Sequence, residues 1–135
     1  MTSVFHQELT LSTPREDFVE ITREVKQAVV ESGVTNGLCT VFCAHTTAGI
    51  TVNENADPTV VTDMLYALDL AYPQRKEYRH LEGNTPAHLK SSAMGCEQTF
   101  PIVDGALPLG IWQGIYFCEF DGPRTRKVII TIVGE

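Results

Sequence analysis

Short strand-like runs and helical patterns follow one another in this chain without strict alternation, and this order constrains the fold most. Residues 4–11 alternate polar and apolar side chains, as a half-buried strand does. Further strand-like runs are residues 38–44, the second half of residues 45–52, and residues 99–103, 111–120 and 126–133. Asp121-Gly122 offers the turn chemistry of a hairpin between the last two runs. Because doubly wound parallel folds alternate strands with helices, this order predicts an α+β fold with a largely antiparallel sheet.

Three segments carry helical patterns. The first is predicted to begin at the N-cap candidate Thr13 and to end at Gly33, since its apolar residues recur on one helical face. The second follows Asp57, a favourable N-cap before a proline, and stops at Pro73. The third spans residues 85–93. The polar stretch between the second and the third helix is predicted to be a loop.

The chain has the size and composition of one globular domain. Of its 135 residues, 43% are hydrophobic and 20% are charged, which suits a packed core with a solvated surface. No internal repeat, linker or charge block divides the chain. We therefore expect a single domain over residues 1–135. The four cysteines match no zinc-ribbon or thioredoxin spacing and are interpreted as core residues or free thiols.

The charge of the chain excludes some partners. Its net charge of −7 repels the phosphate backbone, so nucleic acid is not expected as a partner. No signal peptide and no apolar run of membrane-spanning length is found, so we expect a cytoplasmic protein without a membrane partner. Residues 1–72 hold 3 basic and 10 acidic residues, whereas residues 73–135 hold 7 of each. A basic site for an anion is therefore expected in the second half.

Three histidines occupy the least core-like positions of the chain. His45 stands where a predicted strand ends, His80 in the polar loop, and His88 in the short third helix. Three imidazoles with an open fourth position form a catalytic zinc site in many enzymes. Their spacing matches no local metal-binding motif, so for any one of them taken alone a structural role is the better interpretation. His6 is interpreted as structural.

Carboxylates and arginines supply further candidates. Glu54 could orient a histidine ligand, bind a metal or act as a general base. Asp57 is better explained as a helix N-cap. A calcium loop at this place is excluded, because Pro58 and Met64 stand where that loop needs glycine and glutamate.

Two arginines near the C-terminus are spaced for one strand face. Arg124 and Arg126 could hold phosphate or pyrophosphate bidentately, or could simply be charges on a solvated strand edge. Arg75, Lys76 and Arg79 form a second basic group in the polar loop, with the same two interpretations.

Six blocks in a fixed order carry a family resemblance across nearly the whole chain. These blocks are His45-Thr46-Thr47-Ala48-Gly49, Asn53-Glu54-Asn55-x-Asp57-Pro58, the stretch around His80, Gly83-Asn84 with His88-Leu89-Lys90, Leu109-Gly110-x-Trp112-Gln113 and Glu119-Phe120-Asp121-Gly122-Pro123-Arg124. Together they resemble the YjbQ family. The sequence departs from the family at Ile111, where the family usually has threonine.

The resemblance implies a small α+β protein with a twisted, sandwich-like sheet, a homotrimer and a histidine-rich metal site. It also implies a weak thiamine-phosphate synthase activity, which couples a hydroxymethylpyrimidine diphosphate to a thiazole phosphate. A divalent metal, most plausibly zinc, would bind the leaving diphosphate, and a small phosphorylated molecule or anion is the expected partner. The expected metal ligands are His45, His80 and His88, and the expected catalytic residues are Glu54, Asp57, Asn84 and Arg124.

Two alternatives stay open at this point. Diphosphate transfer normally uses oxygen-ligated magnesium, whereas imidazoles suit zinc. The chain could therefore be a metal-dependent hydrolase of a phosphorylated or carbonyl substrate, with Glu54 as the base toward metal-bound water. It could also be a non-catalytic, trimeric protein that binds a metal or a ligand.

Overall fold

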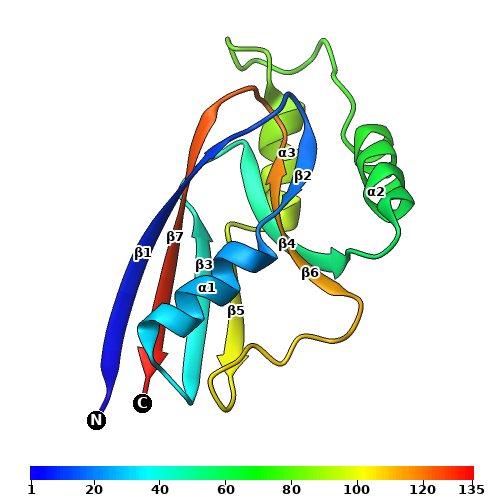
Figure 1. The fold of residues 1–135 in the computed structure, drawn as a ribbon. Coiled ribbons are helices and arrows are strands. Elements are labelled where there is room, and N and C mark those ends of the chain that lie inside the picture. Colours follow the sequence, from blue (N-terminus) through cyan, green and yellow to red (C-terminus); the bar gives the residue numbers. More distant parts are fainter.

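The computed structural model describes all residues from 1 to 135, which form seven strands and three helices (Figure 1). The strands are β1 (Ser3–Ser12), β2 (Asp17–Glu20), β3 (Gly37–Cys43), β4 (Ala48–Glu54), β5 (Glu97–Ile102), β6 (Gln113–Glu119) and β7 (Thr125–Gly134). The helices are α1 (Thr22–Ser32), α2 (Pro58–Ala71) and α3 (Thr85–Met94). None of the helices combines the length and the apolar character that a membrane span requires.

Two antiparallel sheets make up the strand layers. The first has the order β1-β7-β3-β5 and the second the order β2-β6-β4. In the first sheet, Thr131 of β7 lies opposite His6 of β1 on one side and Thr40 of β3 on the other. Every strand pair is antiparallel, so the predicted α+β fold with antiparallel, sandwich-like sheets is confirmed.

Apolar side chains from both sheets and from α1 form the main core. Alternate residues of a strand point to the same face, so β3 presents an apolar face inward, and β7 does so from Val128 onward. The inward residues are Cys39, Val41 and Cys43 of β3, and Val128, Ile130 and Ile132 of β7. Helix α1 adds Val25, Ala28 and Val29 to the same cluster of 18 buried residues. This cluster is the part of the fold that hydrophobic burial stabilises most.

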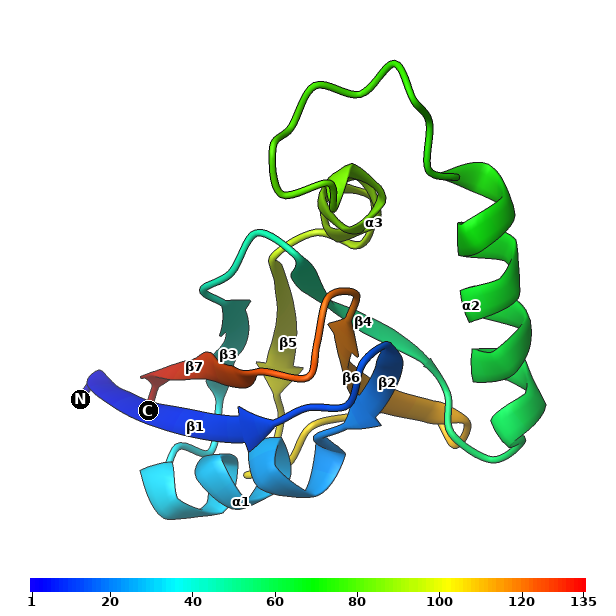
Figure 2. The same cartoon turned by 90° about the horizontal axis from the view of Figure 1, so that it is seen from above.

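A second, smaller cluster lies under α2 and α3. In both views α2 lies on the far side of β2 and β6 from β1 and β7 (Figures 1 and 2). The buried Lys90 of α3 links these parts, because its ammonium group forms ion pairs with Asp69 of α2 and with Glu16. The same ammonium lies 5.9 Å from the ring centre of Phe120. Lys90 thereby connects α3 to α2.

The predicted first helix begins too early. Residues of β2 pair with β6, and α1 starts only at Thr22. Phe18 is buried in the second cluster against two aromatic rings contributed by β6 and the residue after it. Thr13 caps no helix, because its hydroxyl donates to the carboxylate of Glu119. Burial of Phe18 in the sheet has overridden the local helix-start pattern.

The predicted hairpin at Asp121-Gly122 is also wrong. Strand β6 belongs to one sheet and β7 to the other, so this turn carries the chain between the two sheets. The residues Asp121-Gly122 therefore indicate the turn correctly, but they do not indicate which strands pair on either side of it. The crossing brings Glu119, at the end of β6, next to Arg126, near the start of β7.

A buried ion pair occupies this crossing. Glu119 is 0% exposed and Arg126 is 3% exposed. Arg126 donates from Nε to Oε1 of Glu119 at 2.7 Å, and Nη2 donates to the other carboxylate oxygen. Burial raises the pKa of Glu119, but hydrogen bonds from Arg126 and Thr13 outweigh it and hold this pKa below its ordinary value. The carboxylate is therefore charged in the folded protein at neutral pH.

Replacing Glu119 with glutamine tests how much this ion pair contributes. Glutamine keeps the shape of the side chain but removes its charge, so the buried guanidinium of Arg126 loses its counter-ion. We expect Glu119→Gln to lower the free energy of unfolding by about 3 kcal/mol, as breaking a buried pair from one side does. Urea denaturation followed by circular dichroism measures this change.

The matched control is Glu8→Gln, which removes the partner of Lys127 in an exposed ion pair on the first sheet. Exposed pairs contribute little, so we expect a change of about 0.5 kcal/mol or less. Equal effects of the two substitutions would contradict a special role for the buried pair.

Candidate functional site

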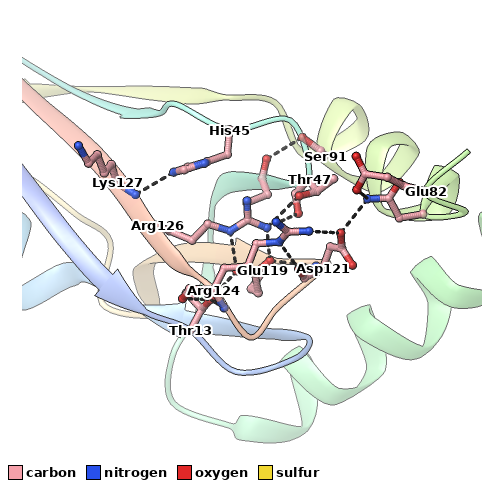
Figure 3. A network of polar contacts seen from close by, with 12 residues as sticks. Thr13, His45, Thr47, Glu82, Ser91, Glu119, Asp121, Arg124, Arg126 and Lys127 are labelled. Atoms are coloured by element: carbon pink, nitrogen blue, oxygen red, sulfur yellow. Dashed lines mark hydrogen bonds and ion pairs between the residues drawn. The ribbon is translucent and has the colours of Figure 1, made fainter. Parts of the chain in front are cut away.

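A polar pocket lies where three segments of the chain meet. The loop after β3, the start of α3 and the start of β7 enclose a volume of about 290 Å³. Figure 3 shows part of this lining, with His45, Thr47, Glu82, Arg124 and Arg126 labelled in their network of polar contacts. The lining residues are Ala44, His45, Thr46, Thr47, Glu82, Asn84, His88, Arg124 and Arg126, of which only Ala44 is apolar. A lining of this kind suits a polar or charged ligand.

Arg126 is held rigidly at this pocket. Besides its ion pair with Glu119, it donates from Nη2 to the hydroxyl of Thr47 at 2.9 Å. Its other terminal nitrogen, Nη1, has no acceptor within the protein. The sequence placed Arg126 on a possible solvated edge, whereas the structure buries it in line with the core residues of β7.

Arg124 is more accessible and is oriented by Asp121. Its Nε donates to the backbone oxygen of Asp121 at 2.7 Å, and its Nη2 donates to Oδ2 of the same residue at 2.9 Å. The side chain is 47% exposed, and its Nη1 has no acceptor within the protein. Burial raises the pKa of Asp121, but hydrogen bonds from Asn84 and Arg124 outweigh this effect, so the pKa lies below its ordinary value.

Asn84 joins this network at the N-cap position, directly before α3. Its Nδ2 donates to Oδ2 of Asp121 at 2.7 Å, so the side chain does not cap the helix. Its Oδ1 is buried without a hydrogen-bond partner. A buried acceptor without a partner is costly, so a donor from a ligand or from water fits at this atom.

His45 enters the pocket as a neutral imidazole. Its Nε2 accepts a hydrogen bond from the backbone N–H of Lys127 at 2.8 Å, which assigns the ring proton to Nδ1. Burial lowers the pKa of His45, and the positive charges of Arg126, Arg124 and Lys127 lower it further, while Glu119 opposes them. The Nδ1–H group is therefore the ring donor that is left for a ligand.

The structure brings two of the three predicted histidine ligands into the pocket. His88 lines it, whereas the exposed His80 lies outside it, with its ring perpendicular to that of His88 and the two ring centres 5.1 Å apart. No three His, Cys, Asp or Glu side chains in the chain are arranged to hold a metal ion. The lone pair of His45 Nε2 is also in use. The residues of this chain do not fit a three-histidine site, and zinc stays a prediction.

Glu54 and Asp57 lie away from the pocket. Strand β4 starts beside Thr47 and ends at Glu54, and six residue steps of a strand span about 20 Å. Asp57 caps α2, since its Oδ1 accepts from the backbone N–H of Thr59 at 2.9 Å. Hydrogen bonds from Thr59 lower the pKa of Asp57. The expected catalytic roles of these two carboxylates beside His45 are therefore not supported, and the N-cap interpretation of Asp57 is confirmed.

Sequence reasoning missed the threonines and the buried carboxylate of the site. Thr46 and Thr47 line the pocket, and Glu119 neutralises Arg126 behind it. One signal was available in the alternation of β7, which places Arg126 on the same face as Val128 and therefore inward. An inward arginine needs a buried acid as a partner.

Known proteins share this architecture along the whole chain. A family model described as UPF0047 protein YjbQ-like matches residues 7–135. The chain belongs to the YjbQ family. The YugU protein of Bacillus subtilis is 54% identical over 124 residues, which cover 91% of this chain and 94% of YugU. A UPF0047 protein of Methanocaldococcus jannaschii is 50% identical over 121 residues, which cover 90% of this chain and 88% of that protein.

A solved structure extends the YjbQ comparison to three dimensions. The crystal structure of a YbjQ-like protein of unknown function from Sulfolobus solfataricus has a TM-score of 0.96 to this chain at 35% identity. The match covers 100% of both chains. The family resemblance read from the six sequence blocks is thus confirmed, and so is the fold that it implied.

Membership of the YjbQ family also corrects the function expected from it. The relatives are described only as UPF0047 proteins, and the Sulfolobus protein as one of unknown function. Nothing in these relatives supports thiamine-phosphate synthase activity or metal binding, so the expected function is wrong. The metal-dependent alternatives lose their basis as well. The homotrimer stays a prediction.

The lowered pKa of His45 predicts a loss of stability in mild acid. Its pKa in the folded state lies below the ordinary value of 6.5, so the unfolded state binds more protons between the two values. The stability that His45 contributes is complete above about pH 6.5 and is lost as the pH falls through the folded pKa. We expect His45→Gln to flatten the fall in unfolding free energy between about pH 7 and pH 5.

Urea denaturation at a series of pH values measures this slope, and His6→Gln, at an exposed histidine on β1, is the control. Acid steps at lower pH belong to the carboxylates with a lowered pKa, Asp57, Glu119 and Asp121, and are expected in all variants. Identical slopes for His45→Gln and the wild type would contradict the neutral state assigned to His45.

Proposed function

We propose that the pocket between the β3–β4 loop, α3 and β7 binds a small phosphorylated molecule or a similar anion. The observation that carries this proposal is the set of hydrogen-bond donors without acceptors in the protein. These donors are Nη1 of Arg124, Nη1 of Arg126 and the Nδ1–H of His45. Phosphate oxygens are among the acceptors whose geometry matches that of guanidinium groups.

The local charge supports an anion although the whole chain is acidic. The net charge is −7, yet three cationic side chains lower the pKa of His45 against one opposing carboxylate. A field that disfavours a proton on His45 favours a negative group at the same place. Glu82 is the only carboxylate among the lining residues. The negative group of the ligand is therefore placed toward Arg124 and away from Glu82.

The donors are also held in place before any ligand arrives. Glu119 and Thr47 fix Arg126, and Asp121 fixes Arg124. Side chains that are already ordered lose little conformational entropy on binding. The N-terminal part of α3 also borders the pocket through Asn84 and His88, and the first turn of this helix holds no acidic residue.

The test is isothermal titration of the protein with inorganic phosphate and with pyrophosphate. We expect both to bind, and Arg124→Ala to weaken binding about tenfold, because one charged hydrogen bond contributes on the order of 1.5 kcal/mol. The matched control is Arg23→Ala, which removes an exposed arginine of α1 outside the pocket. No binding by the wild type, or equal effects of the two substitutions, would show the proposal to be wrong.

A further inference from the structure

A second hollow adjoins the anion pocket. It encloses about 510 Å³ and shares His45, Thr46 and His88 with the first. The rest of its lining is Ser91, Ser92, Gly95 and Cys96. The two hollows therefore adjoin each other at these three residues, and one ligand of sufficient length can occupy both.

One face of α3 forms the wall of this second hollow. His88, Ser91 and Ser92 are three and four residues apart, so they lie on the same side of the helix. The hydroxyl of Ser91 donates to the backbone oxygen of Ala48 at 2.6 Å and holds this wall against β4. Close approach is possible because Gly49 has no side chain, since a Cβ there would lie 2.8 Å from a backbone oxygen. Small side chains on this face leave the hollow open.

The second hollow differs from the first in charge. The first is lined by two arginines and a glutamate, whereas the second has no lysine, arginine or carboxylate in its lining. The exposed hydroxyls of Ser92 and Thr46 face this hollow without a hydrogen-bond partner in the protein. Neutral hydroxyls that donate and accept suit the hydroxyl groups of a ligand, not a second anionic group.

We propose, resting on the anion pocket described above, that the ligand is a phosphate ester of a small hydroxylated molecule such as a sugar or polyol. Its phosphate lies against Arg124 and Arg126, and its hydroxylated part lies along Ser92 and Thr46. The ester oxygen that joins the two parts lies beside His45, where the hollows meet.

Three probes test this assignment by titration of the wild type. They are inorganic phosphate, ribose 5-phosphate and phenyl phosphate. We expect ribose 5-phosphate to bind about tenfold more tightly than inorganic phosphate, which corresponds to a few extra hydrogen bonds. Phenyl phosphate is expected to bind no more tightly than inorganic phosphate, because Cys96 is the only hydrophobic residue in the lining of the second hollow.

Substitutions on α3 locate the effect. Ser92→Leu places a larger apolar group in the second hollow, and Ala93→Leu adds the same side chain at the next, exposed position outside it. In Ser92→Leu we expect the affinity for ribose 5-phosphate to fall to within about twofold of that for inorganic phosphate. In Ala93→Leu we expect ribose 5-phosphate still to bind about tenfold more tightly than inorganic phosphate. Neither substitution is expected to change the affinity for inorganic phosphate, and circular dichroism checks that both variants fold.

The possible failures are distinguishable. If none of the three probes binds to the wild type, the anion pocket itself is wrong and this inference is overturned with it. The anion pocket stands, and the second hollow is not a binding site, if the wild type binds inorganic phosphate as tightly as ribose 5-phosphate. The same conclusion holds if Ser92→Leu still binds ribose 5-phosphate more tightly than inorganic phosphate. Tighter binding of phenyl phosphate than of ribose 5-phosphate would overturn the hydroxylated class of ligand.

Discussion

The buried ion pair between Arg126 and Glu119 is the interaction on which the rest of this structure depends. It connects β7 of one sheet to β6 of the other, at the place where the chain crosses between them. Thr13, between β1 and β2, donates a hydrogen bond to Glu119, and Thr47, between β3 and β4, accepts one from Arg126. Two charges without solvent are tolerable only when each hydrogen-bonds to the other and to further groups. The pair therefore specifies how the two sheets meet.

The candidate site is a consequence of this crossing. The turn that leaves Glu119 carries Asp121 and Arg124 to the start of α3, where Asn84 completes the network. Positive groups consequently gather at one place on an acidic chain, and their orientations are set by protein carboxylates. Burial and the same charges keep His45 neutral by lowering its pKa. A preorganised, positive and polar pocket is suited to an anion without any metal-ligand set within the chain.

Elements with a strong local pattern could be predicted from the sequence, whereas elements that depend on distant contacts could not. The alternation in residues 126–133 and the Asp57 cap gave β7 and α2 in the right places. Phe18 lies on a predicted helical face, but the structure places it in a strand of four residues. That strand is stabilised by β6, which lies about 100 residues later in the chain, so no local pattern indicates it. The site divides in the same way. His45, Asn84, His88 and Arg124 were recognised, whereas Glu54 was grouped with them only because it is near His45 in sequence.

The sequence by itself determined the fold class, the single domain, the family and most of the polar residues that line the pocket. These depend on composition, on periodicity and on short blocks of residues, which are local properties of the chain. Only the tertiary structure decided which residues meet. It separated Glu54 from the histidines by the length of β4, put β6 and β7 in different sheets, and joined Glu119 to Arg126. The physical reason is that burial and charge pairing depend on distances in space, which spacing along the chain does not specify.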